Sequence, residues 1–419
     1  MKRLLMIAFH FPPLAGGSGI QRTLRFVQHL PALGWQPLIL TADPRAYAKT
    51  SSDLLTDIPA STVIQRSFAL DSARHLSLRG RYLGWMARPD RWVSWKWAAV
   101  RDGMHLINTF KPNAIWSTYP IATAHLIGAS LQRESGLPWI ADFRDPMAQD
   151  GYPSDRATWN SFKRVEEQAT ELAAACVFTA PGAVRTYQKR YPKAASRMHL
   201  IENGFDDESF VRPAEQTEAL NPGKLTLLHS GVVYPSERDP LPLFAAIAQC
   251  IQDGRVSRER LRVRFRAAVH EDMLASLVRQ HCLHDVVELC PALPYREALV
   301  EMLRADALLV MQAANCNEQI PAKLYEYLRA GRPILGLTDP CGDTANALRA
   351  AGIASIAALD SASDIAARLP QFLSQIESHQ ADLPHPGAVN AASRHSRSQT
   401  LARLLNHITD GLTLPRGNL

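Results

Sequence analysis

The stretch Glu318-Gln-Ile-Pro-Ala-Lys-Leu-Tyr-Glu-Tyr-Leu-Arg-Ala-Gly331 decides the fold that we predict for this chain of 419 residues. Pro321 suits the first turn of a helix, because an N–H group at that position would have no partner within the helix. Gly331 suits the C-terminal end of the same helix, and the apolar run at residues 333–337 then predicts a buried parallel strand. Between these ends, three residues recur at helical spacing, namely Leu324, Tyr327 and Leu328.

Two carboxylates and a lysine accompany this helix. Glu318 lies in the loop before it, while Lys323 and Glu326 are three residues apart and therefore share a face. The free N–H groups at a helix start suit a phosphate, and a carboxylate accepts hydrogen bonds from both hydroxyls of a sugar diol. The combination fits a nucleotide sugar. The alternative is an exposed Lys323–Glu326 ion pair worth about 0.3–0.5 kcal/mol, and the spacing leaves both interpretations open.

A glycine-containing loop follows the first predicted strand. An apolar run at residues 3–9 precedes a helical pattern at 20–33 and a second apolar run at 37–41, which together predict a β-α-β unit. Gly16 and Gly17 fall in the loop at the carboxyl end of the first strand, where they would let a phosphate or a sugar approach the backbone closely. A plain strand-to-helix turn is the alternative.

Strand and helix patterns alternate twice along the chain. This alternation predicts two doubly wound, Rossmann-like α/β domains that face each other across a cleft. Ligands bind at the carboxyl ends of the strands in such sheets, so Gly16–Gly17, His229–Gly231 and Glu318–Glu326 are expected to line the cleft. The predicted boundaries are 1–205 for the N-terminal domain, 206–222 for a linker, 223–390 for the C-terminal domain and 391–419 for a final helix and tail.

The composition fits a globular protein rather than one that binds nucleic acid. The net charge of +6 is small and spread out, which suits an anionic ligand or an acidic membrane surface. The six cysteines form no Cys-x-x-Cys pair, as expected for reduced thiols. His10 and two prolines interrupt the N-terminal apolar run, so we predict a strand and not a signal peptide. We expect a cytoplasmic protein, because no run approaches the ~20 apolar residues of a membrane span. Peripheral contact with the inner face of the membrane stays open.

Several short motifs extend over nearly the whole chain. In order they are Phe11-Pro-Pro-x-x-Gly16-Gly17, Asp142-Phe-Arg144-Asp145-Pro146, Asn203-Gly-Phe-Asp206, His229-Ser-Gly231, Arg238-Asp-Pro and Glu318-x7-Glu326. In combination they resemble retaining glycosyltransferases of the GT-B fold, in the large group 1 family (family 4). The segment Ile-Pro-Ala-Lys-Leu-Tyr-Glu-Tyr resembles the corresponding segment of family members that build surface polysaccharides.

The resemblance implies a role for each matching residue. Glu326 would hold the ribose hydroxyls of the donor nucleotide, and Glu318 would contact hydroxyls of the donated sugar. Arg238 and Lys323 would face the diphosphate, and Gly16–Gly17 would pack under the diphosphate or the acceptor. The donor would bind on the C-terminal side and the acceptor on the N-terminal side. Cationic side chains and a helix dipole stabilise a leaving diphosphate without metal, and the sequence has no Asp-x-Asp motif. We therefore predict no metal and no cofactor, the nucleotide sugar being a substrate.

One part of the chain departs from the family pattern. Many relatives carry a histidine after the strand at residues 139–142, where this chain has Asp142-Phe-Arg144-Asp145. Asp145 would either face the reacting sugar or form a structural pair with Arg144, and His229 and His10 would each either line the cleft or pack in the core. We expect catalytic roles for Glu318, Arg238, Lys323 and Asp145, and donor-binding roles for Gly16, Gly17, His229, Gly231, Arg238, Lys323, Glu318 and Glu326.

Three functions are consistent with these features. The first is transfer of a sugar from a nucleotide sugar to a glycan or lipid-linked acceptor. The second is a nucleotide-sugar epimerase of the same two-domain architecture, which needs no acceptor. The third is a GT-B protein that binds partners without catalysis, although the intact Glu318, Glu326, Arg238 and Gly17 favour an enzyme.

Residues 74–101 combine basic and tryptophan side chains. Arg and Lys attract anionic headgroups and Trp prefers the membrane interface, which predicts contact with a lipid-linked acceptor. Alternatively, the last three tryptophans are core residues of a helix that covers the first sheet and the arginines are solvated, and the spacing leaves both interpretations open. The residues concerned are Arg74, Arg79, Arg81, Trp85, Arg88, Arg91, Trp92, Trp95, Lys96, Trp97 and Arg101.

Overall fold

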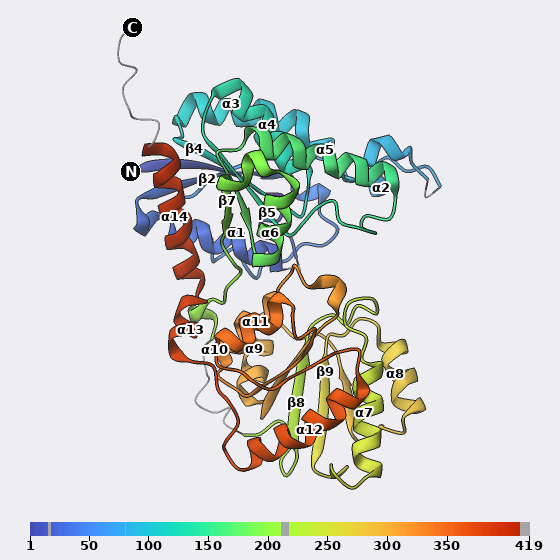
Figure 1. Ribbon diagram of the computed structural model, residues 1–419. Coiled ribbons are helices and arrows are strands. Elements are labelled where there is room, and N and C mark those ends of the chain that lie inside the picture. Colours follow the sequence, from blue (N-terminus) through green and yellow to red (C-terminus); the bar gives the residue numbers. More distant parts are fainter. Residues whose placement is uncertain (16–17, 80, 211–217, 411–419) are drawn as a thin grey trace. The chain divides into compact units, whose positions relative to one another are not determined.

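A computed structural model describes residues 1–15, 18–79, 81–210 and 218–410. Gly16 and Gly17, which the sequence analysis assigned to the donor site, lie outside the described residues. The chain divides into two compact units (Figure 1). Unit 1 comprises Met1–Asn203 and the segment from Arg394 onward, and unit 2 comprises Gly204–Ser393.

Unit 1 contains a parallel sheet of seven strands in the order β3-β2-β1-β4-β5-β6-β7. Its strands are β1 (Lys2–Ile7), β2 (Trp35–Ala42), β3 (Val63–Ser67), β4 (Ala114–Thr118), β5 (Trp139–Arg144), β6 (Ala175–Phe178) and β7 (Met198–Leu200). Its helices are α1 (Ser18–His29), α2 (Ser72–His75), α3 (Trp95–Phe110), α4 (Thr123–Ser135), α5 (Arg156–Leu172), α6 (Pro181–Arg190) and α14 (Arg394–Asp410).

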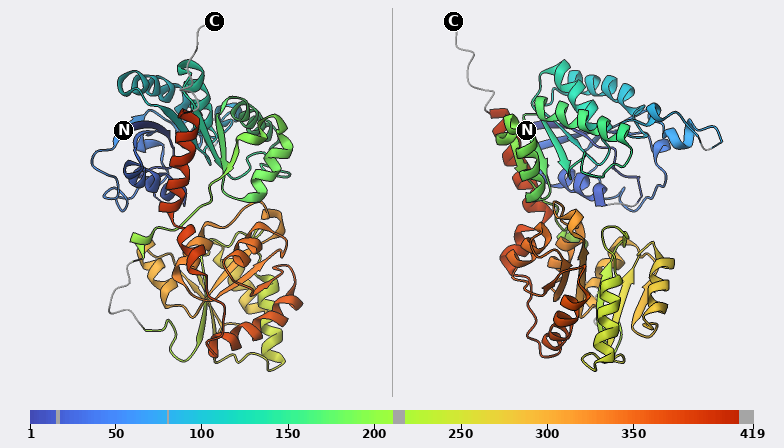
Figure 2. Two further views of the ribbon diagram at one scale, coloured as in Figure 1. Left: turned by 60° about the vertical axis from the view of Figure 1, so that its left-hand side comes forward. Right: turned by 45° about the vertical axis from the view of Figure 1, so that its right-hand side comes forward.

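Helices cover both faces of this sheet, which explains why its strands are almost continuously apolar. Leu4 and Met6 of β1 pack on the face covered by α1 and α14, together with Leu24 of α1 and Leu405 of α14. The C-terminal helix α14 therefore belongs to the core of unit 1, and Figure 2 shows it alongside the N-terminal strands. Polar contacts support this packing, since the indole Nε1 of Trp35 donates to Asn406 Oδ1 at 3.1 Å.

Unit 2 contains a parallel sheet of six strands in the order β10-β9-β8-β11-β12-β13. Its strands are β8 (Leu225–Ser230), β9 (Leu261–Arg266), β10 (Val287–Cys290), β11 (Ala307–Gln312), β12 (Ile334–Thr338) and β13 (Ile356–Ala357). Its helices are α7 (Leu241–Gln252), α8 (Glu271–Gln280), α9 (Tyr295–Arg304), α10 (Ala322–Ala330), α11 (Asp343–Ala350), α12 (Ala362–Glu377) and α13 (Pro386–Ala391).

The prediction of two doubly wound, Rossmann-like domains is confirmed. In each sheet the strand order reverses beside the first strand of the unit, between β1 and β4 in unit 1 and between β8 and β11 in unit 2. Ligand sites in such sheets lie at the carboxyl ends of the strands next to this reversal. None of the helices within the described ranges is long and apolar enough to cross a membrane.

The helix predicted between Pro321 and Gly331 is α10; its C-terminal end agrees with the prediction and its start does not. Gly331 is the C-terminal cap with a left-handed φ of 65°, as expected. Pro321 is the N-cap residue and not part of the first turn, so the helix begins one residue later, at Ala322. The N-cap residue Pro321 makes no side-chain hydrogen bond to the first turn.

Candidate functional site

The carboxyl end of β8 and the start of α10 form the centre of the candidate site in unit 2. The backbone N–H of Ser230 donates to the Tyr327 hydroxyl at 2.8 Å, which fixes α10 against the end of β8. Gly231 has φ +146°, a conformation that residues with a side chain rarely adopt, and a Cβ placed on it would lie 4.0 Å from Cγ of Lys323. Gly231 therefore lets the chain turn directly beside the lysine.

Glu326 is the buried carboxylate of this site. It is only 7% exposed, its Oε1 accepts a hydrogen bond from the Tyr295 hydroxyl at 3.0 Å, and its Oε2 lies 2.7 Å from Nζ of Lys323. The predicted pair of Lys323 and Glu326 thus exists, but it is not on an exposed helix face. Tyr295, the first residue of α9, was missed by the sequence analysis because no local pattern links it to α10.

Positive charge gathers at the end of β8. Burial, followed by the charges of Arg238 and Lys323, lowers the pKa of His229 to about 4, so the ring is neutral at pH 7. Nδ1 of His229 lies 3.0 Å from the Leu309 carbonyl oxygen, and its Nε2 is buried with no hydrogen-bond partner in the described chain. His229 both packs in unit 2 and faces the two cations.

Arg238 is held in the loop that follows β8. Its Nη1 donates to the Val232 carbonyl oxygen at 2.6 Å, and its guanidinium lies 5.4 Å from the centre of the Tyr234 ring. These contacts restrain the side chain near the start of the loop, where it shares the electrostatic environment of His229 and Lys323.

Glu318 lies in the loop between β11 and α10. Hydrogen bonds hold this loop to the end of β11 and to the loop that contains Arg238. Gln312, the last residue of β11, donates through Nε2 to the carbonyl oxygens of Cys316 and Gln319, at 2.9 and 3.1 Å. The N–H of Ala313 donates to the Glu237 carbonyl oxygen at 2.7 Å, which ties this loop to the loop of Arg238. Glu318 and Arg238 therefore stand on connected loops, and no sequence pattern indicated that Gln312 holds the loop of Glu318.

Asp145 belongs to unit 1, immediately after β5. Its Oδ1 accepts a hydrogen bond from the Thr179 hydroxyl at 3.1 Å. The structural ion pair in this region joins Arg22 to Asp142, whose two oxygens lie 2.8 and 3.0 Å from the guanidinium nitrogens. Among the described residues Arg144 and Asp145 form no direct ion pair, although the charge of Asp145 favours the charged form of Arg144.

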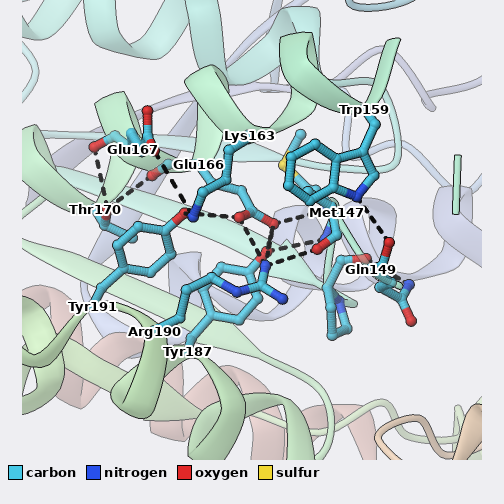
Figure 3. Close-up of polar contacts among 12 residues, drawn as sticks. Met147, Gln149, Trp159, Lys163, Glu166, Glu167, Thr170, Tyr187, Arg190 and Tyr191 are labelled. Carbon is cyan, nitrogen blue, oxygen red and sulfur yellow. Dashed lines mark hydrogen bonds and ion pairs between the residues drawn. The ribbon is translucent and has the colours of Figure 1, made fainter. Parts of the chain in front are cut away.

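A buried network anchors the loop that continues from Asp145 (Figure 3). Glu166 accepts from the Ala148 N–H at 2.8 Å and pairs with Arg190 at 2.9 Å, and the Tyr187 hydroxyl also donates to it. The same Tyr187 oxygen accepts from the Met147 N–H at 3.0 Å. Burial, followed by the charge of Glu166, raises the pKa of Tyr187 well above its usual value. The loop after β5 is thus fastened to α5 and α6 by groups that the sequence analysis did not identify.

The structure therefore brings His229, Gly231, Arg238, Lys323, Glu318 and Glu326 to the carboxyl-end loops of one sheet, and it places Asp145 at the corresponding end of the other sheet. A half-exposed cation beside a buried carboxylate, next to a helix start whose N-cap residue makes no side-chain hydrogen bond, is able to bind a ligand that carries both hydroxyl and phosphate groups.

Comparison with known proteins supports the same fold. No family model and no curated protein matches the sequence. Among solved structures, sucrose-phosphate synthase from Thermosynechococcus elongatus is 13% identical, with 98% of this chain and 97% of that chain covered and a TM-score of 0.63. The Anabaena protein HepE in complex with UDP is also 13% identical, with 98% of both chains covered and a TM-score of 0.63. The α,α-trehalose 6-phosphate synthase from Burkholderia multivorans is 12% identical, with both chains covered completely and a TM-score of 0.65. The chain therefore has the GT-B fold.

Proposed function

We propose that this protein is a retaining glycosyltransferase of group 1 (family 4) that transfers a sugar from a nucleotide sugar to a glycan or lipid-linked acceptor in surface-polysaccharide synthesis. The observation that carries the proposal is the buried Glu326 carboxylate, held between Tyr295 and Lys323 at the carboxyl end of the unit 2 sheet. The fold is consistent with this function, and HepE has been solved with UDP and with UDP-glucose.

In this proposal each group in unit 2 has a separate task. Glu326 accepts hydrogen bonds from the ribose hydroxyls, and Glu318 contacts hydroxyls of the donated sugar. Lys323 and Arg238 stabilise the negative charge that develops on the departing diphosphate. Asp145 faces the sugar from unit 1, and Gly16–Gly17 pack under the diphosphate or the acceptor.

The deciding experiment for the proposed function separates transfer from its alternatives. The full chain is incubated with a panel of UDP- and GDP-sugars, with and without lipid-linked oligosaccharide, and the products are analysed by mass spectrometry. A glycosyltransferase extends the acceptor and releases nucleoside diphosphate. An epimerase converts the nucleotide sugar without acceptor, and a protein that only binds leaves every donor unchanged.

Activity is expected to survive chelation of divalent cations. The proposed site stabilises the diphosphate with Arg238, Lys323 and the start of α10, so Mg²⁺ or Mn²⁺ has no required task there. The measurement is the rate of sugar transfer before and after treatment with EDTA. A loss of rate that Mg²⁺ or Mn²⁺ restores would contradict this part of the proposal.

We also propose that residues 76–79 and 81–88 of unit 1 contact an anionic lipid surface that presents the acceptor. Leu78, Leu83 and Trp85 are 81%, 61% and 68% exposed, and Arg79 and Arg81 are exposed between them. The apolar side chains suit the acyl chains of a lipid layer, and the arginines beside them suit its anionic headgroups. Figure 1 shows this segment next to α2 in unit 1.

The sequence left open whether the tryptophans of this region contact a membrane or lie in the core, and the structure shows some of them buried and others exposed. Trp95 is fully buried, and Trp92 is half-buried with its ring centre 4.8 Å from that of Phe9. Trp97 is 79% exposed, like Trp85. The core interpretation therefore describes Trp95, whereas Trp85 and Trp97 remain available to a surface.

Vesicles that contain anionic lipid should bind the wild type at low salt and release it at high salt, because exposed charges are screened within about 10 Å at 0.1 M salt. The variant Arg79→Ser/Arg81→Ser/Trp85→Ser should bind several-fold more weakly in a flotation assay. The variant Lys193→Ser/Arg403→Ser changes two exposed cations elsewhere in unit 1 and should bind like the wild type. Absence of vesicle binding by the wild type at low salt would refute the lipid contact.

A further inference from the structure

A buried glutamine at the carboxyl end of β11 contacts the loop that carries Glu318. Gln312 is only 4% exposed, and both polar atoms of its side chain have partners. Its Nε2 donates to two carbonyl oxygens of the loop, and its Oε1 accepts from the hydroxyl of Thr344 in α11. A buried amide is unfavourable unless its hydrogen bonds are made, whereas an apolar side chain would pose no such requirement. The contribution specific to Gln312 is therefore the attachment of this loop.

The two carbonyl groups that Gln312 binds stand on either side of Glu318. Cys316 precedes Glu318 by two positions and Gln319 follows it directly, and their oxygens lie 2.9 and 3.1 Å from Nε2. Thr344, which is 1% exposed, donates to Gln312 and also lies 3.4 Å from the Gln319 carbonyl oxygen. One amide and one hydroxyl thus fix the backbone both before and after the carboxylate.

Asn317, the residue directly before Glu318, is held by a different part of unit 2. Its Nδ2 donates to Asp339 Oδ2 at 2.5 Å, and its carbonyl oxygen accepts from the Asp343 N–H at 3.3 Å. The side chain also packs against Gly342, since a Cβ built there would lie 2.5 Å from Asn317 Oδ1. The loop is therefore fastened around Glu318 by groups of β11 and of the segment that follows β12.

Backbone hydrogen bonds complete the order of this loop. Its N–H donors to carbonyl oxygens include Ala313, Cys316, Asn317 and Gln319. Glu318 itself is half-buried. A carboxylate that the protein holds in this way is in place before a ligand arrives, so binding does not have to order the loop.

We propose that Gln312 and Thr344 are positioning residues for sugar transfer, which hold Glu318 where it meets the hydroxyls of the donated sugar. This inference rests on the proposed function, which gives Glu318 that contact. Neither residue touches the donor in this proposal, and both act through Glu318. Glu326 belongs to α10 and not to the loop, so it keeps the nucleotide when the loop is loosened. Loosening the loop should therefore lower the rate of transfer more than the affinity for a nucleoside diphosphate.

The test is a double-mutant cycle on the full chain, with the donor that the transfer assay selects. Gln312→Met keeps the size of the side chain and removes its amide. It should lower kcat/KM for transfer about 10- to 100-fold, while the Kd of the nucleoside diphosphate changes less than about twofold. In a Glu318→Gln background the same substitution should have little further effect, because the carboxylate that it misplaces is already gone. If Gln312→Met lowers kcat/KM equally in both backgrounds, or in neither, it does not act through Glu318 and the proposal is overturned.

Thr344 offers a milder substitution for the case in which Gln312→Met does not fold. Thr344→Val removes the hydroxyl at constant shape and should lower kcat/KM several-fold, again only when Glu318 is present, whereas Thr344→Ser keeps a hydroxyl and should resemble the wild type. Thr226→Val is the matched control. Thr226 is equally buried, and its hydroxyl accepts from Asn221 Nδ2 at 3.1 Å near the start of β8, away from the carboxyl-end loops. A Thr344→Val variant as active as this control would contradict the proposal.

Hydrogen exchange measured by mass spectrometry tests the holding of the loop without any substrate. The amides of residues 313–319 should exchange faster in Gln312→Met and Thr344→Val than in the wild type and in Thr226→Val, because the loop opens more often. Unchanged exchange in this loop would overturn the proposal. A wild-type chain that transfers no sugar would instead count against the proposed function, and the exchange result would still decide whether Gln312 and Thr344 hold the loop of Glu318.

Discussion

Replacing Glu326 by Gln is expected to weaken the binding of the donor nucleotide by about 10- to 150-fold. A hydrogen bond to a charged group contributes about 1.5–3 kcal/mol, and the carboxylate of Glu326 is the acceptor that we assign to the ribose hydroxyls. Gln keeps the size of the side chain, so Tyr295 retains an acceptor, and Lys323, whose side chain is 37% exposed, is solvated when its partner is neutral. The expected loss is therefore one of binding, with the fold intact.

The measurement is calorimetric titration with a panel of nucleoside diphosphates. Glu297→Gln is the matched control, because it makes the same change of charge on the exposed side of α9, two residues from Tyr295. Circular dichroism checks that both variants are folded. If Glu326→Gln binds every nucleoside diphosphate as tightly as the wild type does, the ribose assignment is wrong.

Arg238→Gln and Lys323→Gln are each expected to lower kcat by about 100-fold while changing the KM for the donor much less. Charge develops on the diphosphate as it leaves, so a cation at that position contributes more in the transition state than in the bound substrate. The observation behind this expectation is that the charges of Arg238 and Lys323 both lower the pKa of His229, at the end of β8.

Steady-state kinetics with the donor that the transfer assay selects would test the two residues separately. Arg255→Gln removes a partly exposed arginine that pairs with Asp253 in the loop after α7, and should leave kcat unchanged. A normal kcat for Lys323→Gln would mean that Lys323 only pairs with Glu326. A normal kcat for Arg238→Gln would mean that its contacts with Val232 and Tyr234 are its whole function.

The sequence was sufficient for the architecture because each element has a local signature. Apolar runs bounded by loops predicted the parallel strands, and Gly331 marked the end of α10. The two-residue strand β13 escaped notice because it is too short to show a pattern. The start of α10 was wrong by one residue, since a proline fits the N-cap as well as the first turn.

The contacts that complete the sites could not be predicted, because they join residues far apart in the chain. Tyr295 reaches Glu326 across 31 positions, and Arg22 reaches Asp142 across 120. The tryptophans show a second limit. Trp95 and Trp97 are two positions apart in α3 and so point to nearly opposite sides of the helix, one into the core and one outward. Composition alone could not distinguish Trp95 from Trp97, so both were assigned either to the core or to a membrane contact.

The packing of α14 on β1 and α1 has a consequence for how the chain is made. Unit 2 is a continuous insertion between two pieces of unit 1, and the last piece supplies Leu401 and Leu405 to a core that begins at Leu4. During synthesis from the N-terminus, unit 2 emerges whole and is able to fold first. Until α14 has been synthesised, the part of the unit 1 sheet that α14 covers lacks the packing of Leu401 and Leu405. A chain that stops before Arg394 therefore lacks Leu401 and Leu405 and leaves part of this core uncovered.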